Sequence, residues 1–93
     1  MEYIIIEPNG TRKQFKPAGS KITLEEMQSI VGGYVEKVKT PHGDMLVNED
    51  GRMQKLQPNY VAATIAHTLV VGTVLLCMRE GSKLPFYETK EQV

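Results

Sequence analysis

The chain has 93 residues and a formal net charge of +0, because 11 Lys and Arg residues balance 11 Asp and Glu residues. This length allows one hydrophobic core, so we expect a single domain over residues 1–93. Most duplex-binding domains carry a clear positive excess that displaces phosphate counterions, so the neutral balance disfavours nucleic acid as a partner. Hydrophobic residues make up 41% and charged residues 24%, as in ordinary globular proteins.

Cys77 is the only cysteine, which excludes an internal disulfide. It lies in the apolar run of residues 69–78, where we expect a buried and inert thiol. That run has 10 residues, and a membrane-spanning helix needs about 20. The first residues lack the cationic and apolar pattern of a signal peptide. We therefore expect a cytoplasmic protein with no membrane association.

An opening β-hairpin is predicted from residues 2–8 and 11–16. Three consecutive isoleucines mark its first strand, and Asn9-Gly10 between the strands tolerates the positive φ of a tight turn. Residues 16–21 then form a loop.

The next segment carries start and stop signals of a helix. Thr23 can cap the backbone N–H of Glu26, whose side chain can reach back in a capping box. Gly32 and Gly33 end the helix, since glycine adopts the left-handed conformation readily. The apolar residues recur at helical spacing, so we expect this helix to lie on a sheet: they are Leu24, Met27, Ile30 and Val31.

Two strands are predicted in residues 34–40 and 44–49, joined by the turn "PHGD". In the first of them Val35 and Lys37 share one face while Glu36 and Val38 share the other, so neither face is cleanly buried. We interpret residues 32–51 as mainly scaffold. A role as an interface is the alternative.

A short helix over residues 58–68 is indicated by Pro58 in its first turn and by three alanines. Residues 69–78 form the last predicted strand. It is apolar on both faces and interrupted by Gly72, a pattern typical of a central strand. Residues 80–93 are predicted to form an irregular tail.

The element order β-β-α-β-β-α-β predicts an α+β fold, with a mixed, mainly antiparallel sheet of about five strands and two short helices. Two such helices cover only about one face of a five-stranded sheet. Because the last strand is apolar on both sides, a further surface is needed to cover its second face. We therefore expect a homodimer or a larger homo-oligomer.

Several short segments of the chain resemble one known family. They are residues 30–34 (IVGGY), the turn at residues 48–51, Asn59, and Ala63-Thr64. Over residues 4–76 the sequence is similar to the family called domain of unknown function 3846, and the segment beyond this range is predicted to be specific to this member. The resemblance implies an accessory protein of a phage or mobile element, present in the cytoplasm of the bacterial host and acting by binding. Interference with host defence follows only by analogy.

No catalytic or metal-binding pattern is present in the sequence. His42 falls in a turn and His67 at the end of the second helix, and no further His or Cys stands at ligand spacing. The serines lack a base nearby in sequence. We therefore predict no catalytic residue, no metal and no cofactor.

The most favourable place for a ligand is the start of the second helix. Free N–H groups there can hold a phosphate or a carboxylate, and Asn59, Tyr60 and Lys55 can add a hydrogen bond, a stacking ring and a charge. The alternative is a structural cap with Tyr60 in the core. A helix stop followed by a core aromatic is likewise the alternative for Gly33 and Tyr34. The candidate ligand-binding residues are Gly33, Tyr34, Lys55, Asn59, Tyr60 and Thr64.

These observations predict a non-enzymatic binding protein that holds a host protein or a small nucleotide-like signal molecule. A nucleic-acid-binding module is the alternative, because the element order from residue 11 onward is that of an RNA-recognition domain. The aromatic strand motif with which such domains stack on bases is missing, since residues 35–41 and 70–77 contain no aromatic ring. A small enzyme is the third hypothesis.

Overall fold

The computed structural model describes residues 1–82. Residues 83–93 of the predicted irregular tail therefore lie outside the described chain. The elements are β1 (Glu2–Ile6), β2 (Arg12–Phe15), α1 (Leu24–Val31), β3 (Val35–Thr40), β4 (Gly43–Asn48), α2 (Tyr60–Ala66) and β5 (Val74–Met78). The predicted order of strands and helices is confirmed.

The five strands form one sheet in the order β2-β1-β5-β4-β3, and every neighbouring pair is antiparallel. The predicted α+β fold is thus confirmed. β5 is the centre of the sheet, as the apolar pattern of residues 69–78 indicated, while β2 and β3 are the two edges. The strand is shorter than predicted, because only Val74–Met78 form it and Gly72 lies before it.

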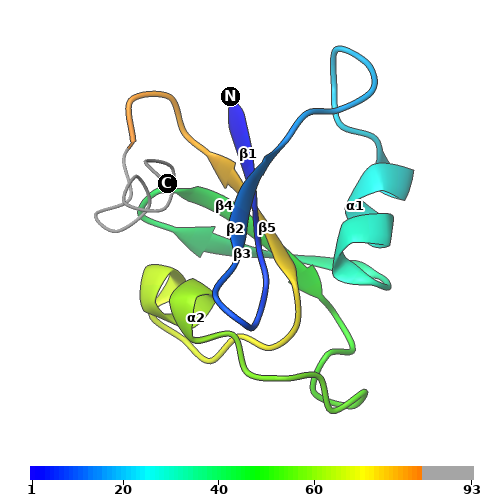
Figure 1. The fold of residues 1–93 in the computed structure, drawn as a ribbon, viewed down its shortest axis with the longest axis vertical. Coiled ribbons are helices and arrows are strands. Elements are labelled where there is room, and N and C mark those ends of the chain that lie inside the picture. Colours follow the sequence, from blue (N-terminus) through cyan, green and yellow to red (C-terminus); the bar gives the residue numbers. More distant parts are fainter. Residues whose placement is uncertain (83–93) are drawn as a thin grey trace.

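The two helices lie on opposite faces of the sheet (Figure 1). Cross-strand pairing sets Ile4, Leu76 and Met45 side by side on one face, and these residues belong to the core cluster that includes Ile65 of α2. The alternate residues of the same strands point to the other face, against which α1 packs.

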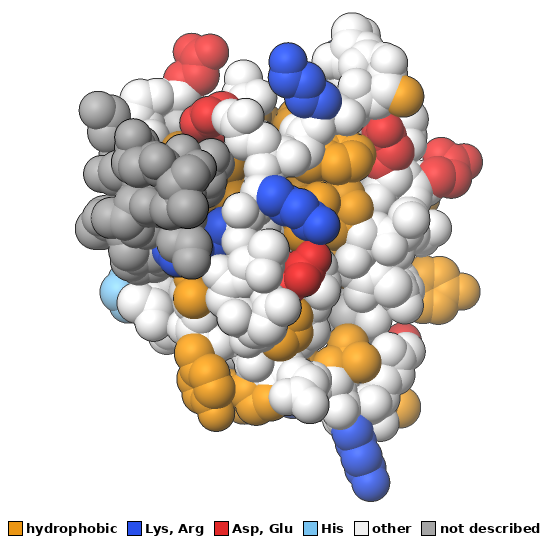
Figure 2. Space-filling view, in the orientation of Figure 1, with side chains coloured by type: hydrophobic (Ala, Val, Ile, Leu, Met, Phe, Trp, Pro, Cys, Tyr) orange, Lys and Arg blue, Asp and Glu red, His pale blue; other side chains and the backbone are white. Residues whose placement is uncertain are grey.

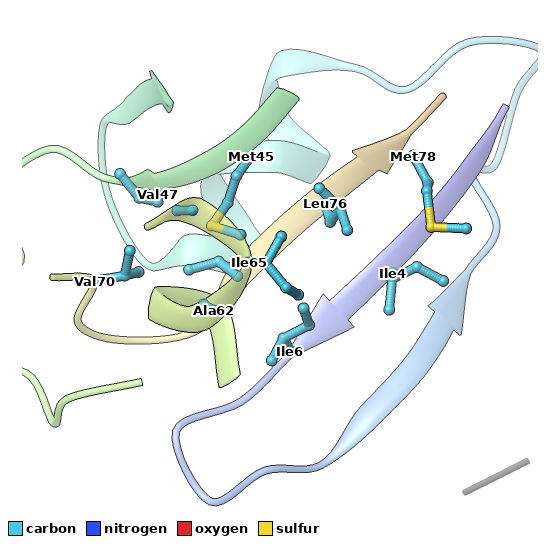
Figure 3. Close-up of a cluster of buried hydrophobic side chains, with 11 residues drawn as sticks. Ile4, Ile6, Met45, Val47, Ala62, Ile65, Val70, Leu76 and Met78 are labelled. Atoms are coloured by element: carbon cyan, nitrogen blue, oxygen red, sulfur yellow. The ribbon is translucent and has the colours of Figure 1, made fainter. Parts of the chain in front are cut away.

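The main core lies between α2 and the sheet (Figure 3). Aliphatic and methionine side chains of β1, β4 and β5 pack against the face of α2 that carries Ala62 and Ala66, whose small side chains let the helix approach the sheet closely. The residues of this core are Ile4, Ile6, Met45, Val47, Ala62, Ile65, Ala66, Val70, Val74, Leu76 and Met78. Burial of such side chains contributes about 1.5–3 kcal/mol each.

The expectation that both helices cover one face is wrong, and with it the argument for a partner subunit. Val74, Leu75 and Leu76 are fully buried within a single chain, because one helix covers each face of β5. A pattern that is apolar on both sides here marks the centre of a three-layered domain. Association into a homodimer or larger assembly stays a prediction without this support.

The local signals of α1 are confirmed in most respects. Thr23 and Glu26 form the capping box, with the N–H of Glu26 donating to Thr23 Oγ1 at 3.1 Å and the N–H of Thr23 donating to Glu26 Oε1 at 2.9 Å. Gly32 ends the helix with φ 83°. Leu24 departs from the predicted apolar stripe, since 59% of it is exposed.

The second helix begins later than predicted. Pro58 is not in its first turn but lies outside the helix, where it forms an isolated bridge with Val71, and Asn59 is the N-cap. In residues 1–82, neither helix has the length and apolarity needed to cross a bilayer.

Candidate functional site

Asn59 is fully buried and uses its whole side chain within the protein. Its Nδ2 donates to the carbonyl oxygens of Ile6 at 3.0 Å and Gly72 at 2.8 Å, and its Oδ1 accepts from the N–H of Ala62 at 3.1 Å. Both amide hydrogens are thus used, and full burial keeps the remaining lone pair of Oδ1 out of reach of a ligand. The structural alternative for Asn59 is therefore the one the geometry supports.

The other residues predicted at the start of α2 lie on the surface. Tyr60 is 72% exposed, so the alternative that placed it in the core is wrong. Thr64 Oγ1 donates to the carbonyl of Tyr60 at 2.9 Å, within the helix. Lys55 is exposed in the preceding loop, in a left-handed conformation with φ 57°.

Gly33 and Tyr34 lie at the other predicted place, where α1 ends. A Cβ on Gly33 would stand 3.0 Å from Asn48 Nδ2, so a larger residue at this position would require the Asn48 side chain to shift by a few tenths of an ångström. Tyr34 is 67% exposed and is not the predicted core aromatic. The two residues line a shallow cavity of ≈ 250 Å³ together with Gln28, Asp50 and Gln54. The carboxylate of Asp50 makes this cavity a poor place for an anion.

The structure does not bring the two predicted places together into one pocket. Neither Asn59 nor Tyr60 lines the cavity that contains Gly33 and Tyr34. The predicted set instead divides into one buried anchor, Asn59, and several exposed positions. Their assembly into an anion-recognising pocket therefore has no support from the geometry.

A larger cavity, which we call the β3 groove, lies beside the edge strand β3 and has a volume of ≈ 390 Å³. Its floor comes from β3 and β4, and its walls from the loop after β4 and from the loop between α2 and β5. The lining residues are Glu36, Val38, Val47, Asn48, Glu49, Arg52, Met53, Thr68, Leu69, Val70 and Val71.

The β3 groove combines exposed apolar side chains with a few charges. Met53 is 82% exposed and Leu69 is 56% exposed, although both are large apolar residues. Glu36, Glu49 and Arg52 are exposed at the same groove. Large apolar side chains with polar neighbours are typical of surfaces that bind other proteins.

Asn48 fixes the geometry at one end of the β3 groove. Its Nδ2 donates to the carbonyl of Val31 and to Gln54 Oε1, each at 3.2 Å, and its Oδ1 accepts from the N–H of Asp50 at 2.8 Å. This buried asparagine joins α1, β4 and the following loop. The wall formed by that loop is therefore held against the sheet.

Sequence reasoning missed the β3 groove because three separate segments of the chain build it, within residues 36–38, 47–53 and 68–71. Met53 and Leu69 have no local pattern that marks them as exposed. The one available signal was the imperfect alternation of β3, in which Val38 shares a face with Glu36. That pattern predicted a strand with one side open to a partner.

A second cavity, which we call the α1 cavity, lies on the opposite face and has a volume of ≈ 380 Å³. Figure 2 shows hydrophobic side chains exposed in the hollow between the first two strands and α1. The lining residues are Met1, Tyr3, Ile22, Met27, Lys37, Gly43, Asp44, Leu46, Cys77 and Arg79.

The thiol in the α1 cavity is not activated. Burial, and secondarily the carboxylate of Asp44, raises the pKa of Cys77 to about 11. A nucleophilic thiol requires the opposite shift, since the thiolate is the reactive form. The side chain is only partly buried, but its protonation agrees with the predicted inert thiol.

The histidines occupy the two places predicted for them. His42 lies in the turn between β3 and β4, where its N–H donates to Thr40 Oγ1 at 3.0 Å, and His67 is the C-cap of α2 with φ 60°. Within residues 1–82, no group of three or more His, Cys, Asp or Glu side chains is arranged to hold a metal ion.

The model of a protein family described as a domain of unknown function (DUF3846) matches residues 1–91. The match extends beyond the range of residues 4–76 in which the resemblance was found, so the prediction that the later segment is specific to this chain is wrong. No curated protein and no solved structure matches the chain.

Proposed function

This chain belongs to the DUF3846 family, and we propose that it is a non-enzymatic protein that acts by binding a partner protein in the β3 groove. The observation that carries the proposal is the exposure of Met53 and Leu69 at the rim of that groove. Apolar side chains of this size favour contact with a second macromolecule, because their burial gains about 25 cal/mol per Å².

The charges of the β3 groove favour a protein over a nucleotide-like molecule. Two carboxylates, from Glu36 and Glu49, stand against one guanidinium, from Arg52. Phosphate groups are held by clusters of Arg and Lys or by free backbone N–H groups. A partner that contributes an apolar anchor and both signs of charge complements these residues better.

Catalysis is not part of the proposal. The pKa of the Cys77 thiol is raised rather than lowered, and the described residues hold no metal-binding group of His, Cys, Asp or Glu. Binding alone requires neither feature.

The biological role that we propose is interference with a host process, with counter-defence as its most specific form, in the cytoplasm of the bacterial host. The support is membership of the DUF3846 family, because the resemblance to that family implied an accessory protein of a phage; the role itself is assigned by analogy. Nucleic-acid binding is the competing role. An RNA-recognition domain stacks bases on the open face of its sheet, whereas here a helix lies on each face (Figure 1).

The decisive experiment is affinity purification from an extract of the host bacterium with the immobilised protein. We expect one host protein to be retained by the wild type and lost from the variants Leu69→Glu and Met53→Glu. Leu24→Glu is the matched control, because Leu24 is also a largely exposed leucine but does not line the β3 groove. Its capture should equal that of the wild type.

A thermal-shift series with cyclic and ADP-ribose-type nucleotides and with RNA tests the competing partners. A ligand at 100 times its Kd stabilises the folded state by about 2.7 kcal/mol, which is readily measured. The proposal fails if a nucleotide or RNA produces such a shift while both groove variants capture the same proteins as the wild type.

A further inference from the structure

Within residues 1–82, the outer side of β3 has no neighbouring strand. The sheet order places β3 at an edge, and in the described part of the chain only β4 pairs with it. The N–H of Glu49 donates to the carbonyl of Tyr34 at 2.8 Å, so residue 34 turns its backbone groups toward the β4 side. Along a strand of an antiparallel ladder, successive residues direct their backbone N–H and C=O groups to opposite sides. Val35, Lys37 and Lys39 therefore direct their N–H and C=O groups outward.

The side chains of β3 differ between its two faces. On the α2 face, Glu36 and Val38 line the β3 groove. On the α1 face, Lys37 and Lys39 are both exposed. Lys37 lines the α1 cavity and forms a partly exposed ion pair with Asp44 of β4, with 3.8 Å between Nζ and Oδ2. A strand added beside β3 would continue this alternation, with every second side chain next to the groove and the others next to the two lysines.

The geometry points to β3 as the docking edge for an extended segment of a partner protein that alternates apolar and acidic side chains. This inference rests on the proposed function of the β3 groove and specifies the partner. The apolar side chains meet Val38, Met53 and Leu69, and the carboxylates lie opposite Lys37 and Lys39. Backbone hydrogen bonds supply affinity in this mode of recognition, while the side chains on the two faces supply specificity.

A second copy of the chain is a poor occupant of the same edge. In antiparallel self-pairing the outward residues of β3 face each other, and the full-length register sets Lys37 opposite the same lysine of the other copy. Like charges directly opposite each other are destabilising. Lysines on an edge strand are also a common means of preventing self-association.

Three synthetic peptides test the inference with the full-length protein. The first is Val-Glu-Val-Glu-Val-Glu-Val, the second carries Lys in place of Glu, and the third is the first with alternate amides N-methylated. The readout is amide hydrogen exchange resolved by residue. We expect the acidic peptide to slow exchange at Lys37 and Lys39 and to leave Glu36 and Val38 unchanged. The amides of the other edge strand, β2, serve as the internal reference.

The N-methylated peptide should bind about tenfold more weakly, because it loses backbone donors. The double variant Lys37→Glu/Lys39→Glu should weaken binding of the acidic peptide roughly fivefold, and it should bind the lysine peptide instead. Lys37→Pro removes an outward N–H that the β3–β4 ladder does not use, so it should weaken binding by up to about tenfold. Lys37→Ala is its matched control and should keep most of the affinity.

The inference is overturned if no peptide slows exchange in β3, if the acidic and basic peptides bind equally, or if N-methylation has no effect. The outward amides could instead become protected as the protein concentration rises, with no peptide present. That result would assign the edge to a second copy of the chain and would also overturn the inference. If these tests fail while Leu69→Glu still abolishes capture of the host protein, the proposed function survives without strand addition. If that capture is also unaffected, both fail.

Discussion

The side-chain amide of Asn59 donates to the backbone carbonyl of Ile6 at 3.0 Å, across 53 residues of sequence. The same side chain bonds Gly72 and caps α2 at Ala62. One buried residue thus ties the end of the first strand to the segment before the central strand and to the start of a helix. Its role is to hold together the face of the sheet that α2 covers.

Replacing Asn59 should therefore be costly. Asn59→Ala leaves two carbonyls and one N–H without their partner, and we expect a loss of about 3 kcal/mol in the free energy of unfolding. Asn59→Asp keeps the cap acceptor but sets a carboxylate against two carbonyl oxygens, so it should destabilise at least as strongly. Urea unfolding gives both values from the shift of the midpoint at unchanged slope. A loss below about 1 kcal/mol for Asn59→Ala would contradict this role.

Gly43 begins β4 with φ 137°, and a Cβ at this position would overlap the backbone oxygen of Cys77. Gly43→Ala should destabilise the protein by more than about 3 kcal/mol, because the clash is with backbone of the neighbouring strand. Gly19→Ala is the control, since nothing lies within 4 Å of its Cβ position. It should change the stability by less than about 0.5 kcal/mol. Equal melting temperatures for the two variants would show that β4 and β5 can move apart at Gly43 to accommodate a Cβ, without loss of stability.

The raised pKa of Cys77, about 11, predicts slow alkylation. At pH 8 the thiol should react with iodoacetamide about 100-fold more slowly in the folded protein than in denaturant, because the thiolate is correspondingly rare. The pKa of this thiol is higher in the folded state than in the unfolded state. Its contribution to stability is therefore complete below pH 9 and is lost as the pH rises toward 11. A fast reaction at pH 8 in the native protein would contradict the inert thiol.

Asp44 offers a control for the cause of that shift. Asp44→Asn removes the smaller, electrostatic contribution and leaves burial in place. The alkylation rate at pH 8 should rise only modestly. A rate equal to that of the unfolded chain would mean that Asp44, and not burial, keeps the thiol protonated.

The protonation state of Glu26 makes the stability of the start of α1 depend on pH. The N–H groups of Ala18 and Thr23 donate to its carboxylate, each at 2.9 Å, and lower its pKa below the ordinary value of 4.5. A lowered pKa contributes stability that is present above pH 4.5 and is lost as the pH falls through the folded-state value. Glu26→Gln should therefore be less stable than the wild type at pH 7, and the difference should fade as the pH falls below 4.5 and through the lowered pKa of the folded state.

Glu25→Gln is the matched control for Glu26→Gln. It removes a charge from the same helical turn and leaves the capping box intact. Chemical denaturation at pH 7 and pH 3 should give a pH-dependent difference only for Glu26. The same pH dependence in both variants would assign the effect to the helix dipole in general.

Local sequence patterns predicted the elements of this fold well. The strand-turn-strand pattern around Asn9-Gly10, the capping box at Thr23, and the glycines after α1 depend on neighbours within a few residues, so the chain carries them in readable form. The apolar run of β5 likewise indicated a central strand. These features needed no knowledge of what packs against them.

The candidate site was not readable in the same way. The sequence left Asn59 open between a ligand-binding residue and a structural cap, until the positions of Ile6 and Gly72 decided between them. Met53 and Leu69 became candidates only because loops distant in sequence meet beside β3.

The sequence by itself determined which segments become strands and helices, because hydrophobic periodicity, caps and turns act over short range. Only the tertiary structure decided that the two helices take opposite faces and that β5 is enclosed within one chain. It also decided that β3, with Lys37 and Lys39, is an edge strand that pairs only with β4 in the part of the chain that the structure describes. These outcomes depend on strand order and on contacts between distant segments, which no local pattern specifies.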